Sequence, residues 1–398
     1  MSHALVISRH PWPMQTTLRR NVTELRRQGV QVDLVCLTDR LTWGARTAPG
    51  VRVFGIPFRQ RRTHAIWYPV HYASFFVWAL IAASVLALGR RYDAVEVDNT
   101  PDFLVFTAVI ARLRRMRIVL FSMELMPELT AARLRVGPGA LSVRIATRLE
   151  RAAIAWADHV ITVSEPCRRI LLGRGLKDHK VSVVPNSHGT AELEPARPAS
   201  PPFLVIQTTL IERYGVRVAI EAMGELAPQF PRLTLEILGE GEGEAALIEL
   251  TTRLGIADRV HFSHHYLPWG EMIDRVRQAT LGIVPLLADG YGDLCVPNKV
   301  LELTAIGVPT VCSRLPAIAE HFPPDALAYF EPGDAGGLAA QVRRLLADPG
   351  AAHRQAARAQ ESMRVLSWDT AATRYLAALG LHRADPLMTQ RTDHALAT

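Results

Sequence analysis

The residues with the clearest chemical pattern lie in one loop and in the helix predicted to follow it. Asp289-Gly-Tyr-Gly292 is a loop that comes after a predicted strand ending at Pro285. Its glycines let the backbone approach a ligand closely. Pro297 suits a first helical turn, and the free amides of that turn together with Lys299 favour the binding of a diphosphate. Glu302 lies three residues further on the same helical face, where a carboxylate accepts hydrogen bonds from a ribose diol.

Short β-rich runs alternate with helical periods in both halves of the chain. The predicted strands cover 4–8, 32–37, 51–56, 94–97, 118–121, 160–163, 181–184, 203–206, 233–238, 260–262, 281–285, 310–312 and 327–330. The predicted helices cover 16–28, 71–89, 102–115, 140–157, 165–173, 215–228, 243–254, 270–279, 297–306, 335–347, 352–365 and 369–380. Such alternation predicts parallel sheets that are covered by helices on both faces.

A proline-rich stretch divides the alternation into two halves. Residues 189–202 read GTAELEPARPASPP, which indicates an interdomain linker. We therefore predict an α/β protein with two doubly wound Rossmann-like domains that face each other across a cleft, in preference to one (β/α)₈ barrel. The predicted parts are an acceptor-side domain (1–188), the linker (189–202) and a nucleotide-sugar domain (203–366). A helix that crosses back to the first domain (367–381) and a tail (382–398) follow.

The loop and helix described first resemble the donor-site signature of GT-B retaining glycosyltransferases of family 4, in the branch that carries Pro-Asn-Lys-x-x-Glu. The resemblance covers nearly the whole chain, because further segments follow the family's order. These are Tyr92-Asp93 with 98–102, Glu124-Leu-Met-Pro-Glu128, 157–164, 180–186, Glu212-Arg-Tyr-Gly215, Leu238-Gly-Glu-Gly241 and Ser367-Trp368.

The resemblance implies transfer of a sugar from a nucleoside diphosphate sugar to a glycan, lipid-linked or small-molecule acceptor, with retention and without a metal or other cofactor. The donor-binding candidates are Arg213, Gly239, Gly241, Tyr291, Gly292, Val296, Pro297, Asn298, Lys299 and Glu302. The catalytic candidates are Glu124 and Glu128, which alternatively favour the first turn of a helix by their charge. The acceptor-side candidates are Arg19, Arg20 and Asn99.

Three positions depart from the family pattern. Leu294 replaces the first glutamate of the Glu-x₇-Glu motif, Met123 replaces a histidine, and Gln207-Thr-Thr209 replaces a glycine after the first strand of the second domain. We interpret these changes as altered sugar recognition. The alternative is a noncatalytic subunit that binds a nucleotide or glycan and supports a partner enzyme. For a GT-B epimerase or phosphorylase we find no specific pattern.

Charge is divided unequally between the halves. Residues 1–200 hold 28 basic and 15 acidic side chains, whereas residues 201–398 hold 17 and 23. No zinc-finger spacing, RNP motif or basic heptad region indicates nucleic acid, so an anionic membrane surface is the favoured partner of the basic half. The four scattered cysteines indicate a reducing cytoplasm. We therefore expect a cytoplasmic protein attached peripherally to the inner face of the plasma membrane.

One uncharged segment, residues 72–88, bears on the same question. It is shorter than the roughly 20 residues that a membrane span needs. The prediction is a largely buried helix packed on a sheet, with a helix partly exposed to lipid as the intermediate possibility. Arg59, Arg61, Arg62 and Trp67 precede the segment, and Arg90-Arg91 follow it.

Overall fold

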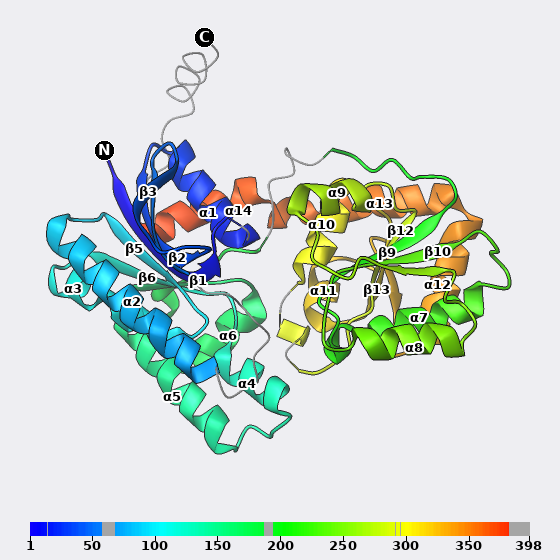
Figure 1. The fold of residues 1–398 in the computed structure, drawn as a ribbon, viewed down its shortest axis with the longest axis horizontal. Helices are drawn as coiled ribbons and strands as arrows, with labels where there is room; N and C mark the ends of the chain where they lie inside the picture. The colour runs from blue at the N-terminus through cyan, green and yellow to red at the C-terminus, as the bar shows by residue number, and fades with distance from the viewer. Residues whose placement is uncertain (14, 58–67, 187–193, 291, 295, 382–398) are drawn as a thin grey trace, which may run out of the picture. The chain divides into compact units, whose positions relative to one another are not determined.

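The computed structural model describes residues 1–13, 15–57, 68–186, 194–290, 292–294 and 296–381. These residues form two compact units, and each unit is described by itself (Figure 1). The first unit comprises Met1–Pro185 together with the chain from Ala371 onward, and the second comprises Asn186–Thr370. The predicted boundary at 188/189 lies within residues 187–193, outside the described part, as do Arg59, Arg61, Arg62 and Trp67.

The first unit is built on an eight-stranded sheet with the strand order β3-β4-β2-β1-β5-β6-β7-β8. All neighbouring strands pair in parallel except β3, which is antiparallel to β4. The strands are β1 (His3–Pro11), β2 (Gln31–Thr38), β3 (Thr42–Ala48), β4 (Val51–Pro57), β5 (Ala94–Asp98), β6 (Arg117–Ser122), β7 (His159–Thr162) and β8 (Val181–Val183).

Helices cover both faces of this sheet, as right-handed crossovers require (Figure 1). The helices α2 (Tyr68–Gly89), α3 (Val109–Leu113) and α5 (Leu141–Trp156) lie in one layer. The same unit also contains α4 (Met126–Leu134), α6 (Glu165–Gly173) and the 3₁₀ turns η2 (Asp102–Ala108) and η3 (Asp178–Lys180). Helices α1 (Thr16–Arg27) and α14 (Trp368–Leu379) cover the other face.

The last helix is tied to the first unit through a buried polar network. The Tyr375 hydroxyl, fully buried, donates to the Glu96 carboxylate on β5. Asn21 Nδ2 donates to the same carboxylate at 3.0 Å. Arg20 donates to Asn21 Oδ1 and, at 2.9 Å, to the Pro185 carbonyl oxygen, where the chain leaves the unit. The outgoing and returning chain segments are thus anchored on one cluster.

The second unit has a six-stranded, wholly parallel sheet with the order β11-β10-β9-β12-β13-β14. Its strands are β9 (Phe203–Gln207), β10 (Thr234–Leu238), β11 (Val260–Phe262), β12 (Leu281–Val284), β13 (Thr310–Ser313) and β14 (Ala328–Phe330). One core joins the sheet to α7 (Val216–Leu226), α8 (Glu244–Arg253) and α12 (Ala335–Ala347). The opposite core joins it to α9 (Trp269–Val276), α10 (Asn298–Ile306), α11 (Pro316–His321) and α13 (Pro349–Met363). The 3₁₀ turns η5 (Glu212–Tyr214), η6 (Gly292–Leu294) and η7 (Arg364–Leu366) complete the described elements.

Three elements were not predicted from the sequence, and one predicted helix is divided. Strand β3 has an exposed surface and no clean alternation of apolar and polar residues, so its pattern resembled a loop. Helices α4 and α11 are only nine and six residues long. The predicted helix 102–115 is a 3₁₀ turn, η2, followed by the five-residue α3.

The prediction that segment 72–88 is a largely buried helix is wrong. Helix α2 forms as expected, but only 28% of its apolar stretch Val70–Gly89 is buried, and that stretch is long and apolar enough to cross a membrane by length and composition alone. Phe75, Ala79 and Ala83 face the sheet, whereas Val77 and Ile81 are about half exposed. Because α2 is apolar on both faces, the periodicity of its sequence did not reveal which face is open.

Candidate functional site

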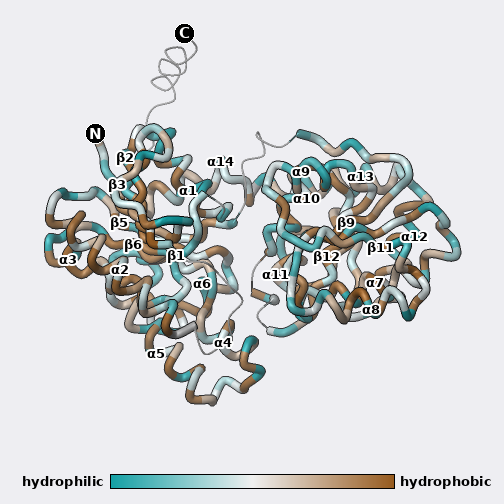
Figure 2. Tube along the Cα trace, in the orientation of Figure 1, coloured by the Kyte–Doolittle hydropathy of each residue, from teal (hydrophilic) through white to brown (hydrophobic). Residues whose placement is uncertain are grey.

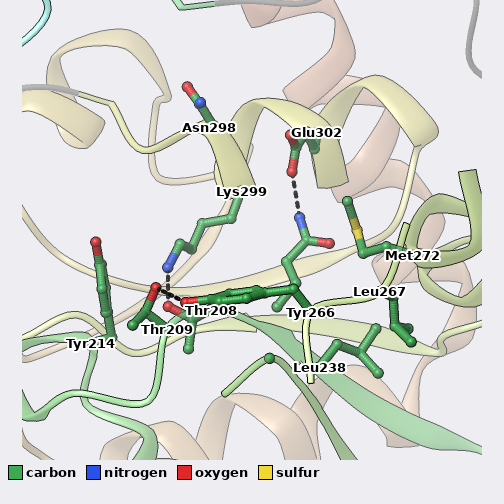
Figure 3. A pocket seen from close by; sticks show the side chains of 12 residues that line it. Thr208, Thr209, Tyr214, Leu238, Tyr266, Leu267, Met272, Asn298, Lys299 and Glu302 are labelled. Carbon is green, nitrogen blue, oxygen red and sulfur yellow. Dashed lines mark hydrogen bonds between the residues drawn. The ribbon is translucent and has the colours of Figure 1, made fainter. Parts of the chain in front are cut away.

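A cavity of about 310 Å³ opens within the second unit at the carboxyl ends of its parallel strands (Figure 3). Ligands of open α/β sheets bind at these ends. The cavity is lined by residues after β9, β10 and β11 and by the first turns of α9 and α10. These residues are Gln207, Thr208, Thr209, Tyr214, Leu238, Gly239, Tyr266, Leu267, Met272, Asn298, Lys299 and Glu302.

Helix α10 begins and ends as its sequence predicts. Pro297 is its N-cap residue and makes no side-chain capping bond, so no capping side chain occupies the amides at the start of the helix, while the Val300 amide donates to the Pro297 carbonyl oxygen. Gly307 ends the helix with φ 84°, in the left-handed region. The side chains of Lys299 and Glu302 therefore project from the same side of α10 toward the strand ends (Figure 3). Val296 packs against the core beneath the helix.

Lys299 is a half-buried cation in the cavity wall. Its ammonium donates to Thr208 Oγ1 and lies 3.9 Å from the ring centroid of Tyr214. Among the described residues, no carboxylate forms an ion pair with it. Burial lowers the pKa of Lys299 to about 7, with Glu302 opposing and Arg213 adding to the shift. An anionic ligand would supply a counter-charge in direct contact with the ammonium, beyond the more distant charge of Glu302.

Glu302 is positioned by a residue from the opposite side of the cavity. Its carboxylate is buried and accepts a hydrogen bond of 2.6 Å from Gln207 Nε2, at the end of β9. The other amide atom of Gln207, Oε1, is buried and has no hydrogen-bond partner among the described residues. Gln207 belongs to the segment Gln207-Thr-Thr209, which departs from the family pattern, and this segment places a polar amide in the cavity.

Arg213 lies beside this wall in the second unit. Its guanidinium forms an ion pair with Asp289 at 2.8 Å and lies 5.9 Å from the Tyr214 ring. Asp289 Oδ1 in turn accepts the Gly292 amide at 2.7 Å. The Asp289 carboxylate therefore holds both Gly292 of the loop and Arg213, the candidate phosphate contact.

The glycines of the Gly-x-Gly turn permit a close approach of two loops. A Cβ atom on Gly239 would lie 1.9 Å from the Thr208 carbonyl oxygen, and the φ of Gly239 is 143°. A Cβ atom on Gly241 would lie 2.2 Å from the Leu210 carbonyl oxygen. These contacts hold the turn after β10 against the turn after β9. Gly239 lines the cavity, whereas Gly241 lies behind it as a packing residue.

Sequence reasoning missed the aromatic and apolar side of the cavity. The hydroxyl groups of Tyr266 and Thr209 form a hydrogen bond of 2.8 Å. Leu267 and Met272, which follow Tyr266 in the chain, also line the cavity. They come after β11, so the rule that sites form at the carboxyl ends of parallel strands would have pointed to this loop. Tyr291 lies outside the described residues.

Asn99, in the first unit, holds the turn that carries Met123 and Glu124. Its Nδ2 donates to Asp102 Oδ1 at 2.9 Å and to the Glu124 carbonyl oxygen at 2.5 Å. Its Oδ1 accepts the amides of Met123 at 2.9 Å and Glu124 at 3.3 Å. Asn99 is only 1% exposed, so it positions Glu124 and offers no surface to an acceptor.

Glu128 forms an ion pair with Arg174, which also holds Glu150. Burial raises the pKa of Glu150 to about 7 and that of nearby Asp102 to about 6, and the cation of Arg174 opposes both shifts. An ion pair with a half-buried arginine that also holds Glu150 favours a structural role for Glu128. Glu124, half-buried at the end of β6, is the better candidate for contact with a substrate.

The two acceptor-side arginines differ in exposure. Arg19 is half-buried on α1. Arg20 is 8% exposed and belongs to the network with Asn21 and Pro185, so its position fits a structural role and not an acceptor contact. Among the described residues, no cluster of three or more His, Cys, Asp or Glu side chains could hold a metal ion.

Two family models match successive parts of the chain. Residues 14–187 match the glycosyl transferase 4-like domain, and residues 201–348 match glycosyl transferases group 1. Among curated proteins, a glycogen synthase of Mycobacterium tuberculosis (strain CDC 1551 / Oshkosh) is 29% identical over 270 residues. That match covers 65% of this chain and 63% of the relative, so the chain spans less than two thirds of that protein.

Two solved structures share the fold over nearly the whole chain. Sucrose-phosphate synthase from Thermosynechococcus elongatus has a TM-score of 0.71 at 18% identity, covering 94% of this chain and 97% of that one. Anabaena Alr3699/HepE, solved in complex with UDP-glucose, has a TM-score of 0.70 at 17% identity, covering 96% and 100%.

Proposed function

The chain joins a glycosyl transferase 4-like domain to a domain of glycosyl transferases group 1 in a GT-B fold, and from this premise we propose that it transfers a sugar from a nucleoside diphosphate sugar to an acceptor. Transfer proceeds with retention and without a metal, as in the family that the donor motif resembles. The acceptor is a glycan, a lipid-linked or a small molecule. The observation that carries the proposal is the half-buried Lys299 ammonium, which faces a cavity without a carboxylate ion-pair partner among the described residues.

The diphosphate is bound at the first turn of α10. Lys299 and the uncapped amides of that turn donate to the phosphate oxygens, and Arg213 adds a second cation. These groups stabilise the negative charge that develops on the leaving diphosphate. Binding supplies an anion to a cation that is otherwise held against Tyr214 and Thr208.

The nucleoside occupies the remainder of the cavity. Glu302 accepts hydrogen bonds from the ribose hydroxyls, with its orientation fixed by Gln207. The base lies against Tyr266, Leu267 and Met272. The neighbour solved with UDP-glucose supports a donor of this chemical class.

We also propose that the protein works in the cytoplasm. Cys36, Cys167 and Cys312 are buried free thiols, which suit a reducing compartment, and Cys295 lies outside the described residues. Met123 and Leu294 modify recognition of the sugar and leave the diphosphate and ribose contacts in place.

Binding of UDP, GDP and dTDP, measured by calorimetry, tests the site. Losing a charge-assisted hydrogen bond costs about 1.5–3 kcal/mol, so Lys299→Met and Glu302→Gln should each weaken the preferred nucleotide about 10- to 150-fold. Lys177→Met, at an exposed lysine of the first unit, is the matched control and should bind as the unchanged protein does. Wild-type affinity in both site variants would reject the assignment.

Turnover of a panel of UDP-, GDP- and dTDP-sugars tests the activity itself. We expect hydrolysis or transfer with at least one donor, lost in Lys299→Met. Tight nucleotide binding without turnover of any donor, across soluble and lipid-linked acceptors, would reject the enzyme and favour a noncatalytic binding subunit.

A further inference from the structure

Helix α2 presents an apolar stripe to the outside of the first unit. Five large side chains on this stripe are 49–65% exposed, namely Val70, Val77, Ile81, Val85 and Leu88. Their spacing of seven, four, four and three residues places them on one helical face, about 27 Å long. The helix contains no charged residue. The outward face of a helix in water normally carries charged and polar groups.

Neighbouring helices of the same layer continue this stripe. The rings of Phe76 on α2 and Phe103 on η2 pack at 5.6 Å, and those of Phe106 on η2 and Trp156 on α5 at 5.5 Å. Figure 2 shows hydrophobic residues along these helices. The exposed apolar residues of the neighbours are Val109 and Leu113 on α3 and Leu141, Ile145 and Leu149 on α5.

Cations accompany the apolar residues of α5, and that helix carries no exposed carboxylate. On α5, Arg144, Arg148 and Arg151 are exposed along one side of the leucine and isoleucine stripe. On and after α3, Arg112 and Arg115 are exposed as well. Every carboxylate side chain between residues 94 and 157, a range that the structure describes in full, is buried or half-buried. Beyond this range, Asp93 is exposed after α2 and Asp158 pairs with Arg112 at 3.5 Å, so the surface is apolar and mainly, not wholly, cationic.

We propose that this surface, the outward stripes of α2, α3 and α5 with their arginines, lies on an anionic lipid bilayer. The apolar residues enter the boundary between headgroups and acyl chains, and the arginines contact lipid phosphates. Trp43, 53% exposed and 5.7 Å from Trp78 of α2, sits at the edge of the stripe, where an aromatic ring anchors at the membrane interface. The inference goes beyond the proposed function, because it concerns where the protein works.

Helix α2 lies on the membrane and does not cross it. Phe75, Ala79 and Ala83 bury its other face in the first unit, and Trp78 Nε1 donates to the Phe54 carbonyl oxygen at 3.4 Å. The carbonyl oxygen of Leu88 accepts from Arg114 at 3.0 Å. Insertion as a span would strip these contacts and expose the sheet.

A second copy of the chain fits the surface less well than lipid. Two copies related by a twofold axis would bring the same face together, and the exposed arginines of α5 would meet each other with no exposed carboxylate on that helix to pair with them. A bilayer rich in phosphatidylglycerol supplies hydrocarbon and negative charge at once.

Vesicle co-sedimentation of the full chain tests the proposal. The chain should bind vesicles of phosphatidylglycerol and phosphatidylcholine, bind phosphatidylcholine alone far more weakly, and dissociate at 1 M salt, where charges are screened within about 3 Å. The double variant Val77→Glu/Ile81→Glu should reduce binding at least tenfold. A separate variant, Arg144→Gln/Arg148→Gln, should also reduce vesicle binding, roughly fivefold for each arginine removed.

The matched control carries the same charge change on exposed apolar residues of the second unit. Ile248→Glu/Leu254→Glu, at positions 39% and 42% exposed, should bind vesicles as the unchanged chain does. Nucleotide affinity should be equal in all variants, which separates loss of membrane binding from misfolding and from failure of the donor site. Absence of binding to anionic vesicles overturns the proposal, as does undiminished binding of Val77→Glu/Ile81→Glu. If light scattering shows that the unchanged chain is a dimer and that Val77→Glu/Ile81→Glu is a monomer, the surface belongs to a second copy instead.

Discussion

The half-buried state of Lys299 predicts that nucleotide binding takes up a proton. In the free protein its pKa is about 7, so about half of the molecules carry the charge at pH 7. A bound diphosphate next to the ammonium favours the charged form and raises the pKa toward its ordinary value. Binding near pH 8 should therefore be accompanied by the uptake of nearly one proton.

The sign and size of the pH dependence follow from this linkage. The charged form of free Lys299 falls from about one half at pH 7 to about one hundredth at pH 9. If the complex keeps the proton, nucleotide affinity should fall about 50-fold over this range, close to 2.3 kcal/mol. The fall begins as pH rises through 7, because the pKa of the free protein sets the start of the window.

Calorimetry in buffers of different ionisation enthalpy measures the proton uptake directly. Lys299→Met should bind weakly at pH 7 and show no fall between pH 7 and 9, whereas Lys177→Met should keep both the affinity and the slope. A flat affinity profile of the unchanged protein, with no buffer dependence of the binding enthalpy, would refute the reasoning that burial has depressed this pKa.

Two further predictions concern stability. Gly239→Ala should lower the free energy of unfolding of the second unit by about 2 kcal/mol or more and weaken nucleotide binding, because its Cβ would meet the Thr208 carbonyl oxygen. The control is Gly255→Ala, at a glycine with φ 66° and nothing within 4 Å of the added Cβ. In chemical denaturation it should cost only about 1 kcal/mol. Equal losses in both variants would contradict the close approach. Tyr375→Phe should cost about 1–3 kcal/mol by leaving the buried Glu96 carboxylate without one donor, and an unchanged denaturation midpoint would show that the bond contributes nothing.

The parts of the site that lie close together in the sequence were predictable from it. Pro297, Lys299 and Glu302 fall within two helical turns, and their types and spacing predict the helix that the structure has; the anion site stays a prediction. The alternation of strands and helices likewise predicted two parallel sheets, since each crossover is a local pattern. Strand β3 was missed because it is an exposed edge strand.

The parts of the site that depend on distant pairs could not be predicted. Gln207 and Glu302 lie 95 positions apart, and nothing local to either residue indicates their hydrogen bond. Arg174 lies 46 positions from Glu128, so the ion pair that favours a structural role for this glutamate was hidden as well. Arg20 appeared as an accessible cation in a basic segment, whereas the fold buries it beside the start of the interdomain connection.

The residues of the network around Glu96 are synthesised at very different times, which imposes an order on folding during translation. The ribosome completes Pro185 long before it makes Tyr375, and at 5–20 residues per second the intervening chain takes about 10–40 s. Throughout that interval the earlier part of the first unit lacks the helix that covers Glu96 and its neighbours. The second unit, contiguous in the chain, can finish folding first. A fragment ending at residue 366 should accordingly show slow, incomplete protection from proteolysis in residues 1–185, restored when the final helix is present.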